Sequence, residues 1–238
     1  MARVIQVRTV AVALCAVAIA LGIWVFDDIR RARLATPQIF AAAQVRYGTA
    51  IDPEMLPPEW MHALLLVEDP LFYDHRGIDL ETPGAGMTSI TQALVKFLYF
   101  PEGFEPGILK LRQSLLARYA LDAGVSKDDQ MRLFLNAAYL GTKDGVAIRG
   151  FGAAAQAWFD KPFGRLNRDE FLMLVGMLAG PDAMSPDTSA GQERLERVKD
   201  YLAGHLEPAS IYDVFYTGHQ GSTAQKAMAG LIRLITLS

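Results

Sequence analysis

The stretch Glu68-Asp69-Pro70-Leu71-Phe72-Tyr73-Asp74-His75-Arg76-Gly77-Ile78-Asp79 places two carboxylates directly after an apolar segment. That segment opens at Pro57-Pro58, and proline is well suited to the first turn of a helix. The two acids therefore fall at the C-terminal end of a predicted helix, where the helix dipole disfavours each acid by about 0.3–1 kcal/mol. Acids kept at a position that lowers stability indicate chemistry, and Glu68 is the first candidate.

A second stretch, Gly86-Met87-Thr88-Ser89-Ile90-Thr91-Gln92-Ala93-Leu94-Val95-Lys96, follows a few residues later. It predicts a helix over residues 88–99 with Ile90, Leu94 and Leu98 on one face. Its first turn offers hydroxyl and amide donors beside a helix N-terminus, where anions bind readily.

Helical periodicity continues along the rest of the chain, whereas strand signals are scarce. Further predicted helices cover residues 108–121, 126–138, 152–159, 167–178, 190–205 and 225–237. In the helix over 108–121 the pattern places Ile108, Leu111 and Leu115 inward and Lys110 and Gln113 along another line. The sequence therefore predicts an all-α fold.

Composition restricts the classes of function. With 238 residues, 51% of them hydrophobic, the chain suits one well-packed domain plus an extra element. A formal net charge of -3 makes nucleic acid a poor partner. The single cysteine, Cys15, excludes an internal disulfide framework and a cysteine-built zinc site.

Residues 9–26 form an uninterrupted apolar run, close to the length of about 20 residues that spans a bilayer. A cleaved signal peptide with a site near Ala18-Ile19-Ala20 would leave an apolar stub, so a retained anchor is the favoured reading. Arginines flank the run on both sides, so charge does not settle the orientation. We expect an anchor at 1–30, a connecting segment at 31–56, the main domain at 57–205 and a C-terminal extension at 206–238, whose apolar helix could lie on a membrane surface.

Taken together and in this order, the motifs resemble those of the family 51 glycosyltransferases, the peptidoglycan glycan-chain polymerases. The residues that match the first motif are Glu68, Asp69, Phe72, His75, Gly77 and Asp79. Those that match the second, with slips, are Gly86, Thr88, Ser89, Ile90, Thr91, Gln92 and Lys96. Residues 126–141, with Asn136 at the family's asparagine, and the stretches 152–161 and 166–186 resemble later motifs, so the likeness runs from about residue 60 to 200.

The resemblance implies a lysozyme-like helical glycosyltransferase domain behind an N-terminal transmembrane helix. It implies polymerisation of lipid-linked disaccharide (lipid II) into glycan chains, with loss of polyprenyl diphosphate and with Glu68 as the general base. We expect a single-pass protein of the bacterial inner (cytoplasmic) membrane with a periplasmic catalytic domain and no transpeptidase domain after residue 238. Its partners would be lipid II, the growing glycan chain, inner-membrane lipid and other cell-wall synthesis proteins.

The resemblance also implies residues that bind substrate. These are Asp69, Phe72, His75, Thr88, Ser89, Thr91, Gln92, Lys96, Lys110, Arg112 and Asn136. Plainer alternatives remain open: an N-cap for Thr88-Ser89, a solvated face for the cations, a core ring for Phe72 and a turn residue for His75. A divalent cation, Mg²⁺ or Mn²⁺, is left open as a cofactor.

Two departures from the family pattern bear on activity. Gln113 stands where a second catalytic Glu is expected, and Leu109 where an Arg is expected. Glutamine keeps the shape but cannot carry charge. Few residues separate Asp79 from Gly86, where the family has a longer mobile segment, so we expect a more open groove.

Three hypotheses follow from the sequence. The first is an active, membrane-anchored glycosyltransferase. The second is a catalytically degenerate relative that binds lipid-linked precursor or a cell-wall synthesis partner without turnover. The third, and weakest, is a glycan-cleaving enzyme that uses a single Glu as general acid.

Overall fold

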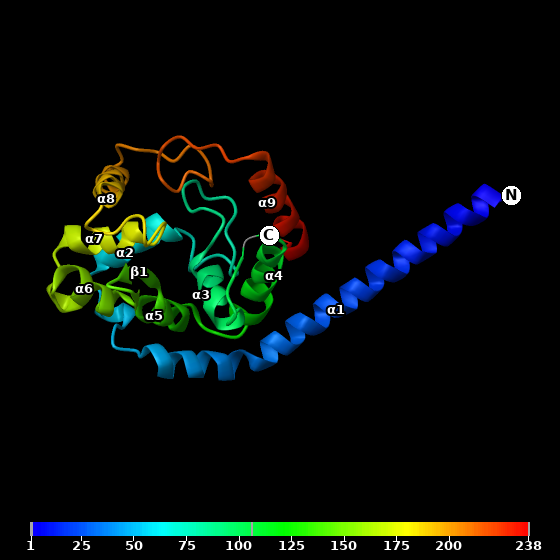
Figure 1. Cartoon of the computed structure of the whole chain (residues 1–238), viewed down its shortest axis with the longest axis horizontal. Coiled ribbons are helices and arrows are strands. Elements are labelled where there is room, and N and C mark those ends of the chain that lie inside the picture. Colours follow the sequence, from blue (N-terminus) through cyan, green and yellow to red (C-terminus); the bar gives the residue numbers. More distant parts are fainter. Residues whose placement is uncertain (1, 106, 238) are drawn as a thin grey trace.

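The computed structural model describes residues 2–105 and 107–237, with side chains from Val10 onward. Helices dominate, which confirms the all-α prediction (Figure 1). The elements are α1 (Ala2–Tyr47), η1 (Pro53–Met55), α2 (Pro58–Glu68), α3 (Ile90–Tyr99), α4 (Ile108–Leu116), the π-helical η2 (Ala117–Leu121), α5 (Lys127–Ala137), β1 (Tyr139–Lys143), β2 (Val146–Arg149), α6 (Phe151–Phe159), η3 (Phe163–Arg165), α7 (Arg168–Met177), α8 (Ser189–Leu202) and α9 (Thr223–Thr236). The antiparallel hairpin β1–β2 was not predicted from the sequence.

Helix α1 has two parts with different surroundings. Its first half stands clear of the domain (Figure 1), and the apolar side chains from Val10 to Phe26 are exposed. Among the described residues, α1 is the one helix long and apolar enough to cross a membrane, with a mean hydropathy of 2.4 in its most apolar window. Its second half continues as helix to Tyr47 and buries Phe40 and Ala43 against the domain. Much of the predicted connecting segment is therefore helix that packs on the domain.

The core lies between α2, α6 and α7 on one side and α3, α5 and η2 on the other. Trp60 of α2 stacks on Phe171 of α7 with ring centroids 4.4 Å apart. Phe151 of α6 and Phe163 pack around the same ring. Aromatic pairs of this kind add about 0.5–1.5 kcal/mol beyond their buried area. The last residue of α2, Glu68, is thus held on a rigid element.

The predicted inward face of the helix over 108–121 is wrong. Ile108 is 79% exposed, whereas Gln113, Ser114 and Ala117 are fully buried. Ser114 and the amide nitrogen of Gln113 can face inward because Gln92 of α3 supplies hydrogen-bond partners for them, whereas the buried Oε1 of Gln113 has no partner among the described residues. The same stretch also changes from α-helix to π-helix at Ala117, which shifts the register of the face.

The C-terminal extension folds back onto the domain. Residues 207–222 are irregular and lie beside the loop between α2 and α3 (Figure 1), with hydrogen bonds from the amides of Gly84 and Gly86 to the carbonyls of Ser210 and Ile211. Helix α9 then packs against α4. The groove was expected to be more open because the 80–85 segment is short. It is instead walled by a segment from the other end of the chain.

Candidate active site

A cavity of about 790 Å³ opens beside the C-terminal end of α2. It is lined by the end of α1, the 84–88 loop, α3, the β1–β2 hairpin, residues 178–181, α8 and the C-terminal segment. Among its described lining residues, Glu68 is the single carboxylate. The cations that line it are Arg46, Lys96, Arg149 and Arg194. The cavity thus combines one acid with an excess of positive charge.

The surroundings of the Glu68 carboxylate favour exchange of a proton near neutral pH. Burial raises its pKa to about 7, Arg194 opposes that rise, and Asp69 adds to it. Burial therefore raises the pKa of Glu68 more than the neighbouring Asp69 does. In the part of the chain that the structure describes, no side chain or backbone amide donates a hydrogen bond to this carboxylate. A free carboxyl with a pKa near neutrality is suited to general-base catalysis.

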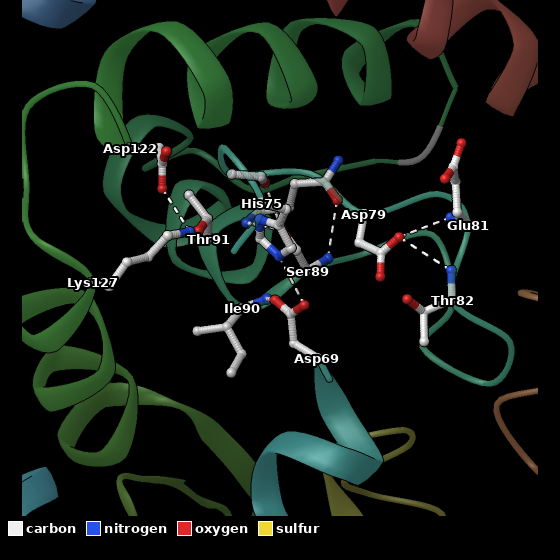
Figure 2. A network of polar contacts seen from close by, with 12 residues as sticks. Asp69, His75, Asp79, Glu81, Thr82, Ser89, Ile90, Thr91, Asp122 and Lys127 are labelled. Carbon is white, nitrogen blue, oxygen red and sulfur yellow. Dashed lines mark hydrogen bonds and ion pairs between the residues drawn. The ribbon is translucent and has the colours of Figure 1, made fainter. Parts of the chain in front are cut away.

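Asp69, predicted to bind substrate, instead joins two elements of the fold. One carboxylate oxygen contacts His75 Nε2 at 2.8 Å and the other accepts the backbone N–H of Ile90 at 2.9 Å. Figure 2 shows Asp69 between these two partners at the start of α3. Only 1% of Asp69 is exposed. Both carboxylate oxygens of Asp69 are thus occupied by protein partners. Through these contacts Asp69 and His75 fix the position of α3 relative to the end of α2.

The side chains that the second motif offers as hydrogen-bond donors fall into two groups. Some are buried in the protein interior, and others line the cavity. Ser89 caps α3 with a complete capping box that involves Gln92, so the N-cap alternative is correct for Ser89. The Thr91 hydroxyl donates to the Gln130 side chain at 2.7 Å, and Gln92 Nε2 donates to the Ser114 hydroxyl at 2.9 Å. Ser89, Thr91 and Gln92 are all buried and are not among the residues that line the cavity, so their side chains hold the fold together here.

Thr88 and Lys96 do line the cavity, and Lys110 lies behind them. Lys110 Nζ donates to the Thr88 hydroxyl at 2.8 Å. Burial, with the neighbouring Lys96, lowers the pKa of Lys110 well below its usual value, and burial lowers the pKa of Lys96. Two ammonium groups held together out of water repel each other, and a bound anion would relieve that repulsion.

Three other predicted substrate ligands have structural partners. Arg112 forms a two-pronged ion pair with Asp28 of α1 at 2.8 and 3.1 Å, so it faces α1 and not the cavity. Phe72 is fully buried as a core ring. Asn136 exchanges hydrogen bonds with the backbone of Ile51 at 3.0 and 2.8 Å.

Gln113, predicted as a catalytic position, does not line the cavity. Its side chain is fully buried, and its Nε2 donates to the backbone carbonyl of Gln92 at 2.6 Å. Among the described residues, no group of three or more histidine, cysteine or acidic side chains could hold a metal ion. With one carboxylate in its lining, the cavity does not fit a divalent cation held by the protein, since Mg²⁺ and Ca²⁺ sites use oxygen ligands.

The sequence reasoning missed Arg194. This side chain is 2% exposed, and within the described part of the chain its Nε and Nη1 have no hydrogen-bond partner. Its signal was an arginine at a core position: Gly191, Leu195 and Val198 share the buried face of α8 with it. Arg46 and Arg149 carry no local signal, since the ends of α1 and β2 meet at the cavity only in the folded chain.

Known proteins similar to the chain are large cell-wall proteins. Residues 37–206 match the transglycosylase family. The chain is 35% identical to penicillin-binding protein 1B of Buchnera aphidicola over 150 residues, which is 58% of this chain and 19% of that protein. It is 32% identical to penicillin-binding protein 1B of Escherichia coli over 143 residues, 55% of this chain and 17% of the relative. It is 30% identical to penicillin-binding protein 1A of Neisseria cinerea over 172 residues, 67% of this chain and 20% of the relative. The chain thus spans about a fifth of the length of the curated relatives it matches.

Proposed function

The chain belongs to the transglycosylase family, and on that premise we propose that it is a membrane-anchored peptidoglycan glycosyltransferase. It polymerises lipid-linked disaccharide into glycan chains and releases polyprenyl diphosphate. The observation that carries this proposal is a single carboxylate, Glu68, with a pKa of about 7 in a cavity whose other charged residues, among those described, are all cations.

The reaction assigns a role to Glu68. A hydroxyl oxygen of the acceptor sugar attacks the anomeric carbon of the donor sugar, and the bond from that carbon to the diphosphate oxygen breaks. The hydroxyl proton passes to the Glu68 carboxylate, and the electron pair leaves with the diphosphate. A base with a pKa near the working pH is efficient in such a transfer because it is both deprotonated and basic.

The leaving group carries negative charge that develops as the bond breaks. Lys96 and Arg194 line the cavity with Glu68, and both are largely withdrawn from water. Among the described residues the buried Nε and Nη1 of Arg194 have no hydrogen-bond partner, so no protein carboxylate neutralises its charge, which can act on the diphosphate through the cavity wall. Charged donors fixed before the reaction stabilise the developing charge without reorganisation.

Helix α1 provides the link to a lipid-borne substrate. Its apolar first half is exposed along its length, as expected for a segment with lipid around it. Its second half packs on the domain, and residues Arg46 and Tyr47 at its end line the cavity. The anchor and the site are therefore one connected element, which suits a substrate presented at a membrane surface.

A polymerisation assay tests the proposal. Purified full-length protein in detergent with lipid-linked disaccharide is expected to make glycan chains, and Glu68→Gln is expected to lose turnover by at least about a hundredfold. Glu102→Gln is the matched control, since Glu102 is exposed and outside the cavity lining. Full activity of Glu68→Gln would end the proposal.

The second candidate function is binding of the lipid-linked precursor without turnover. The observation that favours it is the lack of a second carboxylate in the described lining of the cavity. Retained binding of lipid-linked disaccharide by a wild-type protein that makes no chains would establish it. Release of sugars from finished peptidoglycan would instead point to glycan cleavage.

A further inference from the structure

The C-terminal segment 207–221 lies outside the stretch that matches the transglycosylase family, yet it forms part of the candidate active site. Val214 lines the cavity together with Gly84 and Gly86. The Gly84 amide donates to the Ser210 carbonyl at 2.9 Å and the Gly86 amide to the Ile211 carbonyl at 2.8 Å. The segment therefore pairs with the loop that carries one wall of the cavity.

The two glycines make this close approach sterically feasible. Both have a positive φ, +82° for Gly84 and +75° for Gly86, which favours glycine. A Cβ on Gly84 would lie 2.7 Å from Pro208 Cγ, and one on Gly86 would lie 2.7 Å from Val214 Cγ1. The loop sequence is thus matched to a segment more than a hundred residues further along the chain.

The segment is held in one conformation from within. The carboxylate of the buried Asp213 accepts backbone N–H groups of Ala209, Thr217 and Gly218 at 2.8 to 3.0 Å. Burial alone would raise the pKa of Asp213, but these backbone hydrogen bonds together lower it. A carboxylate this well satisfied fixes the turn around Tyr216.

Tyr216 connects the segment to the catalytic groups. The guanidinium of Arg194 lies 4.6 Å from the centre of the Tyr216 ring, within cation–π range. The Tyr216 ring also packs against the ring of Tyr201 of α8, with ring centroids 4.5 Å apart. Tyr216 has a left-handed φ of +56°, which is uncommon for a residue of this size and persists only where the surroundings enforce it.

We infer that residues 207–221 are an integral wall of the active site and that Tyr216 is a positioning residue that holds the Arg194 guanidinium beside Glu68. The inference rests on the proposed function for its consequence in turnover, but the positioning itself is measurable without turnover. Loss of the Tyr216 ring would free Arg194 to move away from Glu68.

The charge on Glu68 responds to groups from each neighbouring element. Arg194 of α8 lowers its pKa, Asp69 at the end of α2 raises it, and Tyr216 interacts with it from the C-terminal segment. Lys96 of α3, Arg46 of α1 and Arg149 of β2 line the same cavity. Of these groups, only Arg194 contacts the Tyr216 ring.

The experiment is a titration of the Glu68 carboxyl in the full-length protein in detergent, by NMR of carboxyl-¹³C-labelled glutamate. The Glu68 signal is assigned by its loss in Glu68→Gln. An opposite charge close to a carboxyl lowers its pKa by about 1–3, so partial release of Arg194 in Tyr216→Leu is expected to raise the pKa of Glu68 by about 0.5–1. Tyr216→Met, which fills the same space with a flexible chain, is measured beside it in case the leucine variant does not fold.

Two controls separate positioning from general stability. Tyr216→Phe keeps the ring and is expected to move the titration less than Tyr216→Leu does, because only the interaction of the hydroxyl is lost. Tyr212→Leu makes the same change on the same segment, away from Arg194, and is expected to leave the titration unchanged. If neither Tyr216→Leu nor Tyr216→Met moves the Glu68 titration, or if Tyr212→Leu moves it equally, the inference is overturned. If the wild type makes no glycan chains but the titration responds as described, the proposed function fails while the positioning role stands.

Discussion

Replacement of Glu68 by glutamine should stabilise the fold while it removes activity, because the folded protein raises the pKa of this carboxyl. The folded value is about 7 against 4.5 for an ordinary glutamate, a difference that corresponds to about 3 kcal/mol. Since Glu68 faces a cavity and is only half-buried by accessible area, solvent reduces this figure, and we expect about 1–3 kcal/mol.

The sign follows from proton linkage. The folded state binds the proton more tightly than the unfolded chain, so the contribution of Glu68 to stability is fully present below pH 4.5 and is lost as the pH rises through about 7. Glutamine imitates the protonated acid at every pH. The variant should therefore be closest to the wild type at pH 5, where the difference is small, and exceed its melting temperature at pH 8 by roughly 3–10 °C.

Thermal unfolding followed by circular dichroism in detergent, from pH 5 to pH 8, measures this difference. Glu102→Gln, at an exposed position, is the control and should show no pH-dependent gain. A constant difference between Glu68→Gln and wild type over that range would refute the raised pKa, and with it the electrostatic argument for a base at this position.

Further predictions concern the site and the anchor. The turnover rate should rise with pH through a midpoint near 7, because Glu68 must lose its proton to act as a base; a rate independent of pH from 5 to 8 would contradict this. Lys96→Ala should weaken binding of a polyprenyl diphosphate by about ten- to a hundredfold in a titration, whereas Arg112→Ala should leave that affinity within about twofold and lower the melting temperature, since Arg112 pairs with α1. Gln113→Glu should lower the free energy of unfolding by about 3 kcal/mol with no gain in rate, because it places a carboxylate against a backbone carbonyl in the interior; a faster enzyme would show that this position acts in the reaction. A protein that lacks residues 1–26 should lose most of its flotation with lipid vesicles. Flotation of this shortened protein at the wild-type level would assign membrane binding to the apolar helix α9 instead.

Helix limits and caps were largely predictable because their causes are local. The helices predicted over 126–138 and 167–178 correspond to α5 and α7, which Ser126 and Asn167 cap at their N-termini. Glu68 was found in the same way, as an acid at the end of a helix, and the structure places it in the cavity.

Other features depend on contacts between distant parts of the chain. Apolar periodicity placed Ile108 inward, but the buried face of α4 is polar, because α3 offers partners for Gln113 and Ser114. Arg194 and Val214 enter the cavity from α8 and from the C-terminal segment, and nothing near them in sequence marks that meeting. The motif donors Thr91 and Gln92 were correctly seen as polar, yet the direction of their side chains depended on packing.

The charged residues that line the cavity bear on whether a single carboxylate is sufficient for the proposed reaction. A second acid near Glu68 would raise the pKa of Glu68 further and reduce its fraction in the basic form at neutral pH. Arg194 has the opposite effect, since it lowers that pKa. The π face of the Tyr216 ring attracts the Arg194 guanidinium, whereas a carboxylate in the same place would neutralise its charge. The C-terminal segment thus supports an arginine that keeps its charge for the leaving diphosphate, in a cavity whose described lining has one carboxylate and four cations.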